Sequence, residues 1–356
     1  MPRLSRPRSA VRLLPVGSFQ LDDYINAVKF SPDGRQLAVG DASGQVAVWD
    51  VVLKRFASRA AGHRGAVLTM GWHPDGRLLG TGGEDGVGRI WNVGTGEELA
   101  VLPVGEGQAW VEHLAWEPGG HRLAMTAGKI LQIVRWPENG VCHVEAEMAG
   151  HASTVSDICW RRGHPGEIIS SCFGGAKLWG MGGEQPLKTF SYEGALLAVT
   201  LSTDGQYLAS GNLDGSVHLW STATNQHWHM AGYPCKVRHV AFDPQGDYLW
   251  TVAGPDLVAW SAKKFEGTSG RLFRGHLGWI QGIACHPCRS IVATTGEDGL
   301  LCLWQPKTTK PMLSEELNVS GGLSCVAWSP NDVCIATGAD NGMVSLFSVE
   351  GAGESR

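Results

Sequence analysis

Short apolar runs separated by polar, glycine-rich turns recur along the chain. A run that ends in an aromatic residue occurs eight times, at Trp49, Trp91, Trp136, Trp179, Trp220, Trp260, Trp304 and Phe347. Successive aromatic residues lie 40 to 45 residues apart, which indicates eight copies of one unit. No segment places apolar residues at the 3.6-residue period of a helix, and the runs have the length of strands. The pattern therefore predicts an all-β protein.

Two turns recur upstream of each aromatic residue. The first reads SPDG at 31–34, HPDG at 73–76 and EPGG at 117–120, and a proline followed by Asp or Gly favours a type I or II turn. The second reads GEDG at 83–86 and again at 296–299, where Asp-Gly favours a tight hairpin. Three strands per copy are thus indicated, and the residues between copies leave room for a fourth.

These copies resemble WD40 repeats, whose period is about 40 to 45 residues and whose units each supply four strands. The family's Gly-His dipeptide is present at 62–63, 150–151 and 275–276, whereas Trp-Asp is found at 49–50. The resemblance spans about residues 13 to 350. It implies a single closed β-propeller of four-stranded blades. We expect eight blades, or seven if one degenerate copy, most simply the third, forms no blade.

A closed ring of blades needs a latch between its two ends. The resemblance implies that residues 14–21 form the outer strand of the blade whose other three strands come from 324–349. We expect a disordered basic amino-terminal tail over residues 1–12, which hold four arginines and no acidic residue, a propeller over 13–350 and a carboxy-terminal tail over 351–356. An organelle-targeting segment is the alternative for the first tail.

In two copies, the resemblance implies a hydrogen-bonded relay inside the blade. Its positions are held by His63, Thr81, Asp85 and Trp91 in the second copy and by His276, Thr294, Asp298 and Trp304 in the seventh. A buried indole N–H needs an acceptor, and an imidazole can bridge a hydroxyl and a carboxylate, so we expect a structural rather than a catalytic role. The fourth copy has Phe173 in place of the Asp, and the third and sixth have altered second turns around Gly128 and Gly254, so we expect these copies to lack the relay.

Composition narrows the class of protein. An apolar fraction of 43% suffices for a core, and 18% charged residues argue against disorder. The net charge of −5 does not favour binding to a phosphate backbone. The longest apolar run, residues 195–201, is far too short to cross a bilayer. Nine cysteines, an odd number without an export signal, favour free thiols and a cytoplasmic location.

Motifs for catalysis are missing from the sequence. We find no phosphate-binding glycine loop, no H-E-x-x-H helix and no G-x-S-x-G elbow. Cys285 and Cys288 have C-x-x-C spacing, but no second pair of ligands accompanies them. We therefore expect no enzyme, no metal site and no cofactor.

Function is expected on the loops, because a rigid scaffold concentrates binding residues there. The resemblance places partner-binding positions just before the first strand of each copy and just before the Asp of the second turn. Aromatic residues and arginine dominate binding hot spots, so these positions give as the candidate partner-binding face Tyr24, Trp110, Trp279, Lys236, Arg238, Glu84 and Glu297. The alternative for either tryptophan is that it plugs the central channel.

We expect a non-enzymatic interaction scaffold that binds one or more proteins or peptides, as a monomer or as a subunit of a hetero-complex. Neither nucleic acid nor membrane is an expected partner. Two alternatives remain open. One is a small-molecule or metal-binding propeller enzyme that uses the channel. The other is an RNA or membrane-surface adaptor that acts through the basic tail with Lys236 and Arg238.

Overall fold

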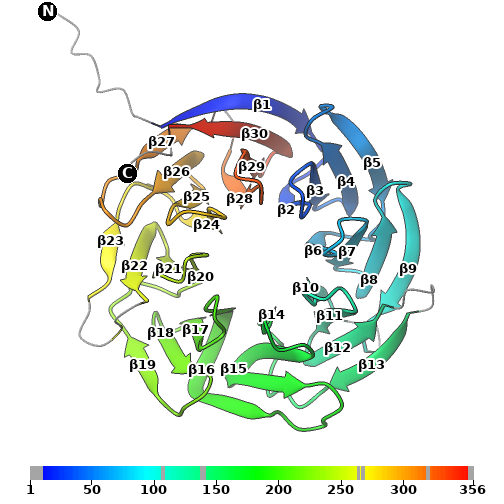
Figure 1. Ribbon diagram of the computed structural model, residues 1–356. Helices are drawn as coiled ribbons and strands as arrows, with labels where there is room; N and C mark the ends of the chain where they lie inside the picture. The colour runs from blue at the N-terminus through cyan, green and yellow to red at the C-terminus, as the bar shows by residue number, and fades with distance from the viewer. Residues whose placement is uncertain are drawn as a thin grey trace, which may run out of the picture.

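The computed structural model describes residues 11–105, 109–136, 142–262, 265, 269–317 and 321–351. Every regular element within these ranges is a β-strand, and the strands form seven antiparallel sheets, six with four strands and one with six. Figure 1 shows the sheets arranged like spokes around a central axis, in the manner of a propeller. The expected all-β architecture with four-stranded blades is confirmed for this part of the chain. It holds no helix long and apolar enough to span a membrane.

Three four-stranded sheets come from the first three copies, and each runs from the axis outward in chain order. They contain β2 (Ile25–Phe30), β3 (Gln36–Asp41), β4 (Gln45–Asp50) and β5 (Arg55–Ala61); β6 (Val67–Trp72), β7 (Leu78–Gly83), β8 (Val87–Asn92) and β9 (Glu97–Pro103); and β10 (Val111–Trp116), β11 (Arg122–Ala127), β12 (Ile130–Arg135) and β13 (His143–Met148). The third copy, which we named as the simplest one to lack a blade, therefore forms a complete sheet.

The fourth and fifth copies share the six-stranded sheet. It contains β14 (Asp157–Trp160), β15 (Glu167–Gly180), β16 (Lys188–Leu201), β17 (Tyr207–Asn212), β18 (Val217–Ser221) and β19 (His227–Met230). The expectation of eight separate blades is not supported, because the hydrogen-bonded sheets number seven. The physical reason lies in β15 and β16, each 14 residues long, which continue the ladder where the other copies have a break.

The strand β15 doubles back on itself. The indole N–H of Trp179 donates to Ser170 Oγ at 2.8 Å, although the two residues are nine apart and a straight strand would separate them by about 30 Å. The reversal falls at Gly174 and Gly175, whose φ angles of +95° and +127° are open to glycine but strained for other residues. Beyond it, Gly175 to Leu178 pair with the first part of β16, and the last part of β16 pairs with β17.

The last three copies again form four-stranded sheets. They contain β20 (His239–Phe242), β21 (Tyr248–Ala253), β22 (Asp256–Ser261) and β23 (Arg271–Phe273); β24 (Ile280–Cys285), β25 (Val292–Gly296), β26 (Leu300–Trp304) and β27 (Leu313–Glu316); and β28 (Leu323–Trp328), β29 (Cys334–Ala339), β30 (Met343–Glu350) and β1 (Arg12–Gln20).

The first strand of the chain lies in the last sheet. Strand β1 pairs antiparallel with β30 along its whole length, and the two run side by side in Figure 1. The hydroxyl of Ser324 donates to the backbone oxygen of Ile25 at 2.6 Å, so β28 also contacts β2 of the first sheet. Residues 11 and 12 were expected in the disordered tail, but Val11 is buried and Arg12 opens β1. The rest of the expected tails, residues 1–10 and 352–356, lies outside the described residues.

The core lies between neighbouring sheets rather than within any one of them. Leu37, Leu79 and Leu123, at equivalent places on the second strands of three successive sheets, have no exposed surface. Tryptophans on inner strands add hydrogen bonds between sheets. The indole N–H groups of Trp72, Trp116 and Trp160 donate to the backbone oxygens of Lys29, Gly71 and Ala115 at 2.9, 3.1 and 2.9 Å. Each acceptor lies on the inner strand of the preceding sheet, so apolar packing and hydrogen bonding both join one sheet to the next.

Strand β1 also packs against the first sheet, and this contact is open to a direct test. Phe19 of β1 stacks on Trp49 with ring centroids 4.5 Å apart, and its ring meets Phe56 at 5.0 Å. We predict that Phe19→Ala lowers the free energy of unfolding by about 3 kcal/mol, because a buried ring is replaced by a cavity. Leu14→Ala, on the exposed side of the same strand, is the control. Urea unfolding that gives the same midpoint for both variants would contradict the role assigned to Phe19.

Candidate protein-binding face

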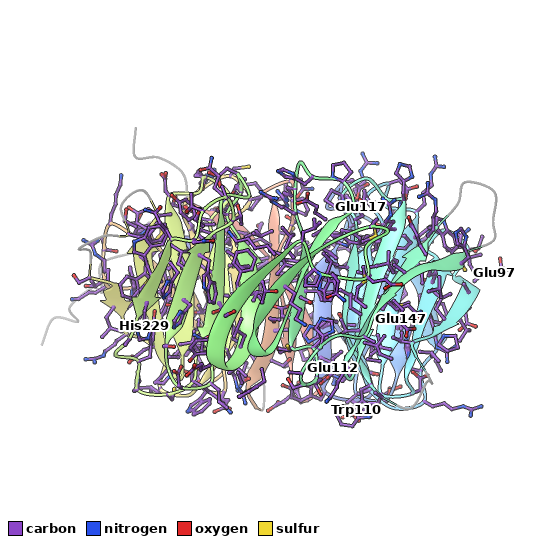
Figure 2. All side chains as sticks on the ribbon, turned by 90° about the horizontal axis from the view of Figure 1, so that it is seen from below. Glu97, Trp110, Glu112, Glu117, Glu147 and His229 are labelled. Carbon is purple, nitrogen blue, oxygen red and sulfur yellow. The ribbon has the colours of Figure 1, made fainter. Side chains whose placement is uncertain are left out.

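The two faces of the disc carry different loops. In each antiparallel sheet, the turn between the second and third strands and the loop that leads into the first strand lie at one end, which we name the second-turn face. The turns between the first and second and between the third and fourth strands lie at the other end, the first-turn face. Figure 2 shows Trp110 and Glu112, at the start of β10, at one edge of the disc, and Glu117, just after β10, at the other.

Three of the candidate residues present aromatic rings to solvent on the second-turn face. The exposed fraction is 52% for Trp110, 38% for Trp279 and 36% for Tyr24. The ring of Trp110 projects from the edge of the disc (Figure 2). Burial, followed by unfavourable electrostatic interaction with Cys325, Asp340 and Glu297, raises the pKa of Tyr24. The three rings are therefore partly open to solvent on this face.

The ring of Trp279 contacts two cationic side chains, Lys236 and Arg238, from the loop that leads into the neighbouring sheet. Lys236 Nζ and the Arg238 guanidinium carbon each lie 5.8 Å from the centre of its ring. Cation–π attraction holds a cation near an indole without removing its charge. Across the described ranges of the chain, no carboxylate forms an ion pair with either side chain.

The two glutamates of the candidate face also hold its loops in place. Glu84 Oε2 accepts the backbone N–H of Ala66 at 3.1 Å. Glu297 accepts the backbone N–H of Trp279 at 3.4 Å and the side-chain amide of Gln281 at 2.6 Å. Each carboxylate thus fixes the loop that leads into the first strand of its own sheet, in addition to lying on the face.

Three exposed apolar residues on the second-turn face were not selected from the sequence. They are Phe173 and Leu213, both 55% exposed, and Leu277, 91% exposed. Phe173 pairs with Ala195 in the ladder, and the backbone N–H of Leu213 donates to Ala195 O at 3.0 Å, so both flank the start of one inner strand. The sequence did offer one indication for Phe173, since it is a large apolar residue at a turn position that normally holds Asp.

The structure brings together the four side chains of each relay. In the second copy, the His63 Nδ1–H donates to Asp85 at 2.8 Å, the Thr81 hydroxyl donates to His63 Nε2 at 2.8 Å, and the Trp91 N–H donates to Thr81 Oγ1 at 2.9 Å. The carboxylate acceptor fixes this tautomer. The seventh copy repeats the arrangement, with distances of 3.0 Å for His276–Asp298, 2.7 Å for His276–Thr294 and 2.7 Å for Trp304–Thr294.

The fourth and sixth copies lack the His-Thr-Asp-Trp set, as expected, but each has a different set of hydrogen bonds around its tryptophan. In the fourth, the His151 Nδ1–H donates to the Lys129 carbonyl at 2.9 Å in place of the missing Asp, and Ser170 links His151 at 2.7 Å to Trp179. A backbone carbonyl can thus accept this hydrogen bond where no carboxylate is present.

In the sixth copy a tyrosine takes the place of the histidine. The Trp260 N–H donates to the Tyr233 hydroxyl at 2.7 Å, and this hydroxyl lies 2.7 Å from Thr251 Oγ1. Burial raises the pKa of Tyr233 to about 12, so the phenol stays protonated and can donate onward. In the third copy, the buried side-chain amide of Gln132 donates to the Pro103 carbonyl at 3.1 Å.

The charges of the second-copy relay follow from its surroundings. Burial lowers the pKa of His63, although Asp85 opposes this effect, so the imidazole is neutral near pH 7. Burial alone would raise the pKa of Asp85, but hydrogen bonds from His63 and from the Arg64 backbone, together with the Arg89 guanidinium, hold it below its ordinary value. The carboxylate is therefore charged and fully engaged inside the sheet.

We predict that Asp85→Ala lowers the free energy of unfolding by about 1 to 3 kcal/mol, because it leaves a buried imidazole N–H without an acceptor. Glu147→Ala is the matched control, since Glu147 is an exposed carboxylate on β13 (Figure 2). Thermal melts are the measurement. An Asp85→Ala protein as stable as the parent would show that the relay does not stabilise the fold.

Three imidazoles gather on the outer strands of the fifth copy. The ring of His218 lies 4.6 Å from that of His229 and 5.9 Å from that of His227, measured between centroids. Among the described residues, Nδ1 of His218 is buried without a hydrogen-bond partner. Burial, followed by repulsion from the other two imidazoles, lowers the pKa of His218 to about 4.

This shift makes stability depend on pH. Between about pH 6.5 and pH 4, the unfolded chain binds a proton at His218 that the folded chain excludes, so the free energy of unfolding falls as the pH falls, by up to about 1.4 kcal/mol per pH unit. We predict that His218→Gln makes the decrease in melting temperature from pH 7 to pH 5 smaller than in the parent. His143→Gln, at an exposed site on β13, is the control. Equal decreases in parent and His218→Gln would contradict the prediction.

Metal-ligating side chains do not converge in the ranges that the structure describes, since no group of three or more His, Cys, Asp and Glu residues there could hold an ion. The two thiols of the C-x-x-C segment differ in environment. Burial raises the pKa of Cys285 to about 12, whereas Cys288 is exposed. His286, between them, is buried and contacts Asp332 of the next sheet.

Comparison with known families agrees with this architecture. A family model described as WD domain, G-beta repeat matches residues 14–50, 55–92, 184–221, 267–305 and 314–348, just over half of the chain. The third, fourth and sixth copies, whose turns depart most from the repeat pattern, lie largely outside the matched segments. The family model thus matches the copies with regular turns and does not match those with irregular turns.

Several curated proteins are similar to parts of this chain. A nuclear distribution protein nudF of Aspergillus niger is 24% identical over 61% of this chain and 55% of its own length. The THO complex subunit 3 of Arabidopsis thaliana is 23% identical over 54% and 62%, and the echinoderm microtubule-associated protein-like 2 of Mus musculus is 26% identical over 52% and 28%. The matches therefore span less than two thirds of each relative.

Among solved structures, the crystal structure of the computationally designed Ika8 protein superimposes with a TM-score of 0.79. It covers 94% of this chain and 99% of its own, with 22% sequence identity. At this identity the likeness concerns the fold alone.

Proposed function

Because the chain belongs to the WD40 repeat family, we propose that it is a non-enzymatic interaction scaffold that binds partner proteins through its second-turn face. The observation that carries the proposal is the set of exposed aromatic rings at Trp110, Trp279 and Tyr24, which sit in loops of a rigid β-sheet framework. Exposed aromatic residues on fixed loops provide large contact areas at a small cost in conformational entropy, as binding hot spots do.

The names of the relatives support a role in assembly. One is a subunit of a complex and another is a microtubule-associated protein. We extend to this chain only the general property that such names share, namely association with other macromolecules. Partners that are proteins or peptides fit the exposed aromatic residues, and the chain would act as a monomer or as a subunit of a hetero-complex in the cytoplasm.

The non-enzymatic part of the proposal is supported by the burial of the relays. Thr81 has no exposed surface and already accepts the Trp91 N–H, so its hydroxyl is not placed to attack a substrate. The same holds for Thr294, which is equally buried and accepts the Trp304 N–H. These sets of imidazole, hydroxyl and carboxylate resemble catalytic triads in composition but lie within the sheets.

We predict that the double variant Trp110→Ala with Trp279→Ala loses the capture of partner proteins while its melting temperature changes little, because both rings are substantially exposed. The measurement is affinity capture with crosslinking from the cells that produce the protein, followed by mass spectrometry. Parent and variant are compared at the same expression level.

The matched control is Val52→Ala with Leu53→Ala. These residues are 71% and 57% exposed and lie in the turn between β4 and β5, on the first-turn face. The control should retain the partners of the parent. Recovery of the same partners by the tryptophan double variant would remove the second-turn face from the proposal.

A further inference from the structure

Two cations on the second-turn face keep their charge available. Several arginines in the described parts of the chain are held by carboxylates, as Arg89 is by Asp85 and Glu98. Lys236 and Arg238 instead flank the ring of Trp279 and pair with no carboxylate among the described residues. Arg238 is exposed and Lys236 is half-buried. An anion that approached Trp279 would therefore meet two unneutralised positive charges.

These two cations lie next to exposed apolar residues of the two preceding copies. The backbone N–H of Val237 donates to Asn212 O at 3.0 Å, which places Lys236 and Arg238 beside the turn that carries Leu213. Leu213 in turn is joined through Ala195 to Phe173. We define this contiguous row as the clamp strip, formed by Phe173, Leu213, Lys236, Arg238 and Trp279.

Acidic residues lie near both ends of the clamp strip. Glu193 and Asp214 lie beside its apolar end, and the Asp214 carboxylate accepts the Tyr192 hydroxyl. Beyond Trp279, Glu297 and Asp340 both lie close enough to Tyr24 to raise its pKa by electrostatic repulsion. Acidic groups thus border the strip on both sides, and its two cations lie together at Lys236 and Arg238.

We propose that the clamp strip binds an extended acidic peptide segment of a partner protein, with an apolar side chain of the peptide against Phe173 and Leu213 and its carboxylates between Lys236 and Arg238. This inference deepens the proposed function and rests on it. Apolar contact and charge complementarity would act at different points of the strip, so the peptide binds in one direction and one register. Because Arg238 is exposed and Lys236 is partly exposed, binding weakens as salt is added.

The test uses fluorescein-labelled synthetic peptides in which one Phe or Leu is separated by two to four residues from a Glu-Glu pair, with peptides carrying Lys-Lys in place of Glu-Glu for comparison. Fluorescence anisotropy measures binding to the whole chain at low and at physiological salt. The expected result is binding of the acidic peptides alone. The double variant Lys236→Glu with Arg238→Glu should weaken it at least about tenfold.

Two further variants complete the design. Phe173→Ser with Leu213→Ser should weaken binding without changing its dependence on salt, because it removes apolar contact only. Lys307→Glu with Lys310→Glu is the matched charge control, since both lysines lie in the turn between β26 and β27 on the first-turn face. This control should bind the acidic peptides like the parent.

The outcomes separate this inference from the proposed function. If partner proteins are captured in a tryptophan-dependent manner but acidic peptides do not bind, or bind no better than the lysine peptides, the clamp strip is overturned and the scaffold stands. The clamp strip is also overturned if the charge control weakens binding as much as the Lys236 and Arg238 variant does. If RNA or anionic vesicles, tested as competitors, bind at these cations in preference to the peptides, the clamp strip serves another class of partner and the inference fails.

Discussion

Each sheet of this protein depends on its neighbours to bury its two faces. The apolar residues of a strand point to both sides, and Leu37, Leu79 and Leu123 lose all their exposed surface only because another sheet lies against them. A four-stranded sheet alone in water would leave at least one of these layers open. The same contact carries the indole hydrogen bonds of Trp72, Trp116 and Trp160 to the preceding sheet. Packing between sheets is therefore the interaction on which every loop position depends.

The relays show how one physical requirement is met by several side chains. A buried tryptophan N–H must find an acceptor, and in the second copy it finds Thr81, which His63 and Asp85 hold in place. The fourth copy keeps the imidazole but uses a backbone carbonyl, and the sixth uses the hydroxyl of Tyr233. What persists among these copies is the satisfaction of the indole rather than the identity of its partners.

The sequence predicts those parts of the structure that depend on residue type at a fixed spacing. The period of the aromatic residues gives the repeat, and the Asp-Gly turns give the hairpins. The partner of His151 could not be foreseen, because a backbone carbonyl leaves no mark in the sequence. The shared sheet of the fourth and fifth copies depends on the path of β15 and β16 around Gly174, which residue types do not specify. For the candidate face, the sequence names its tryptophans but gives no weight to Phe173, whose importance depends on its exposure.

The protein has more acidic than basic residues, yet Lys236 and Arg238 beside Trp279 form no ion pair among the described residues. An ion pair would hold Lys236 and Arg238 in place but would also cancel their charge. The indole orders the two side chains and leaves the charge intact, because the attraction between a cation and a ring does not neutralise the cation. Nearby carboxylates are occupied elsewhere, since Glu297 is held by Gln281 and Asp340 accepts the backbone N–H of Gly322 at 2.8 Å. Around Trp279, the carboxylates are thus engaged by the loops while Lys236 and Arg238 keep their charge, as the proposed binding of an acidic peptide requires.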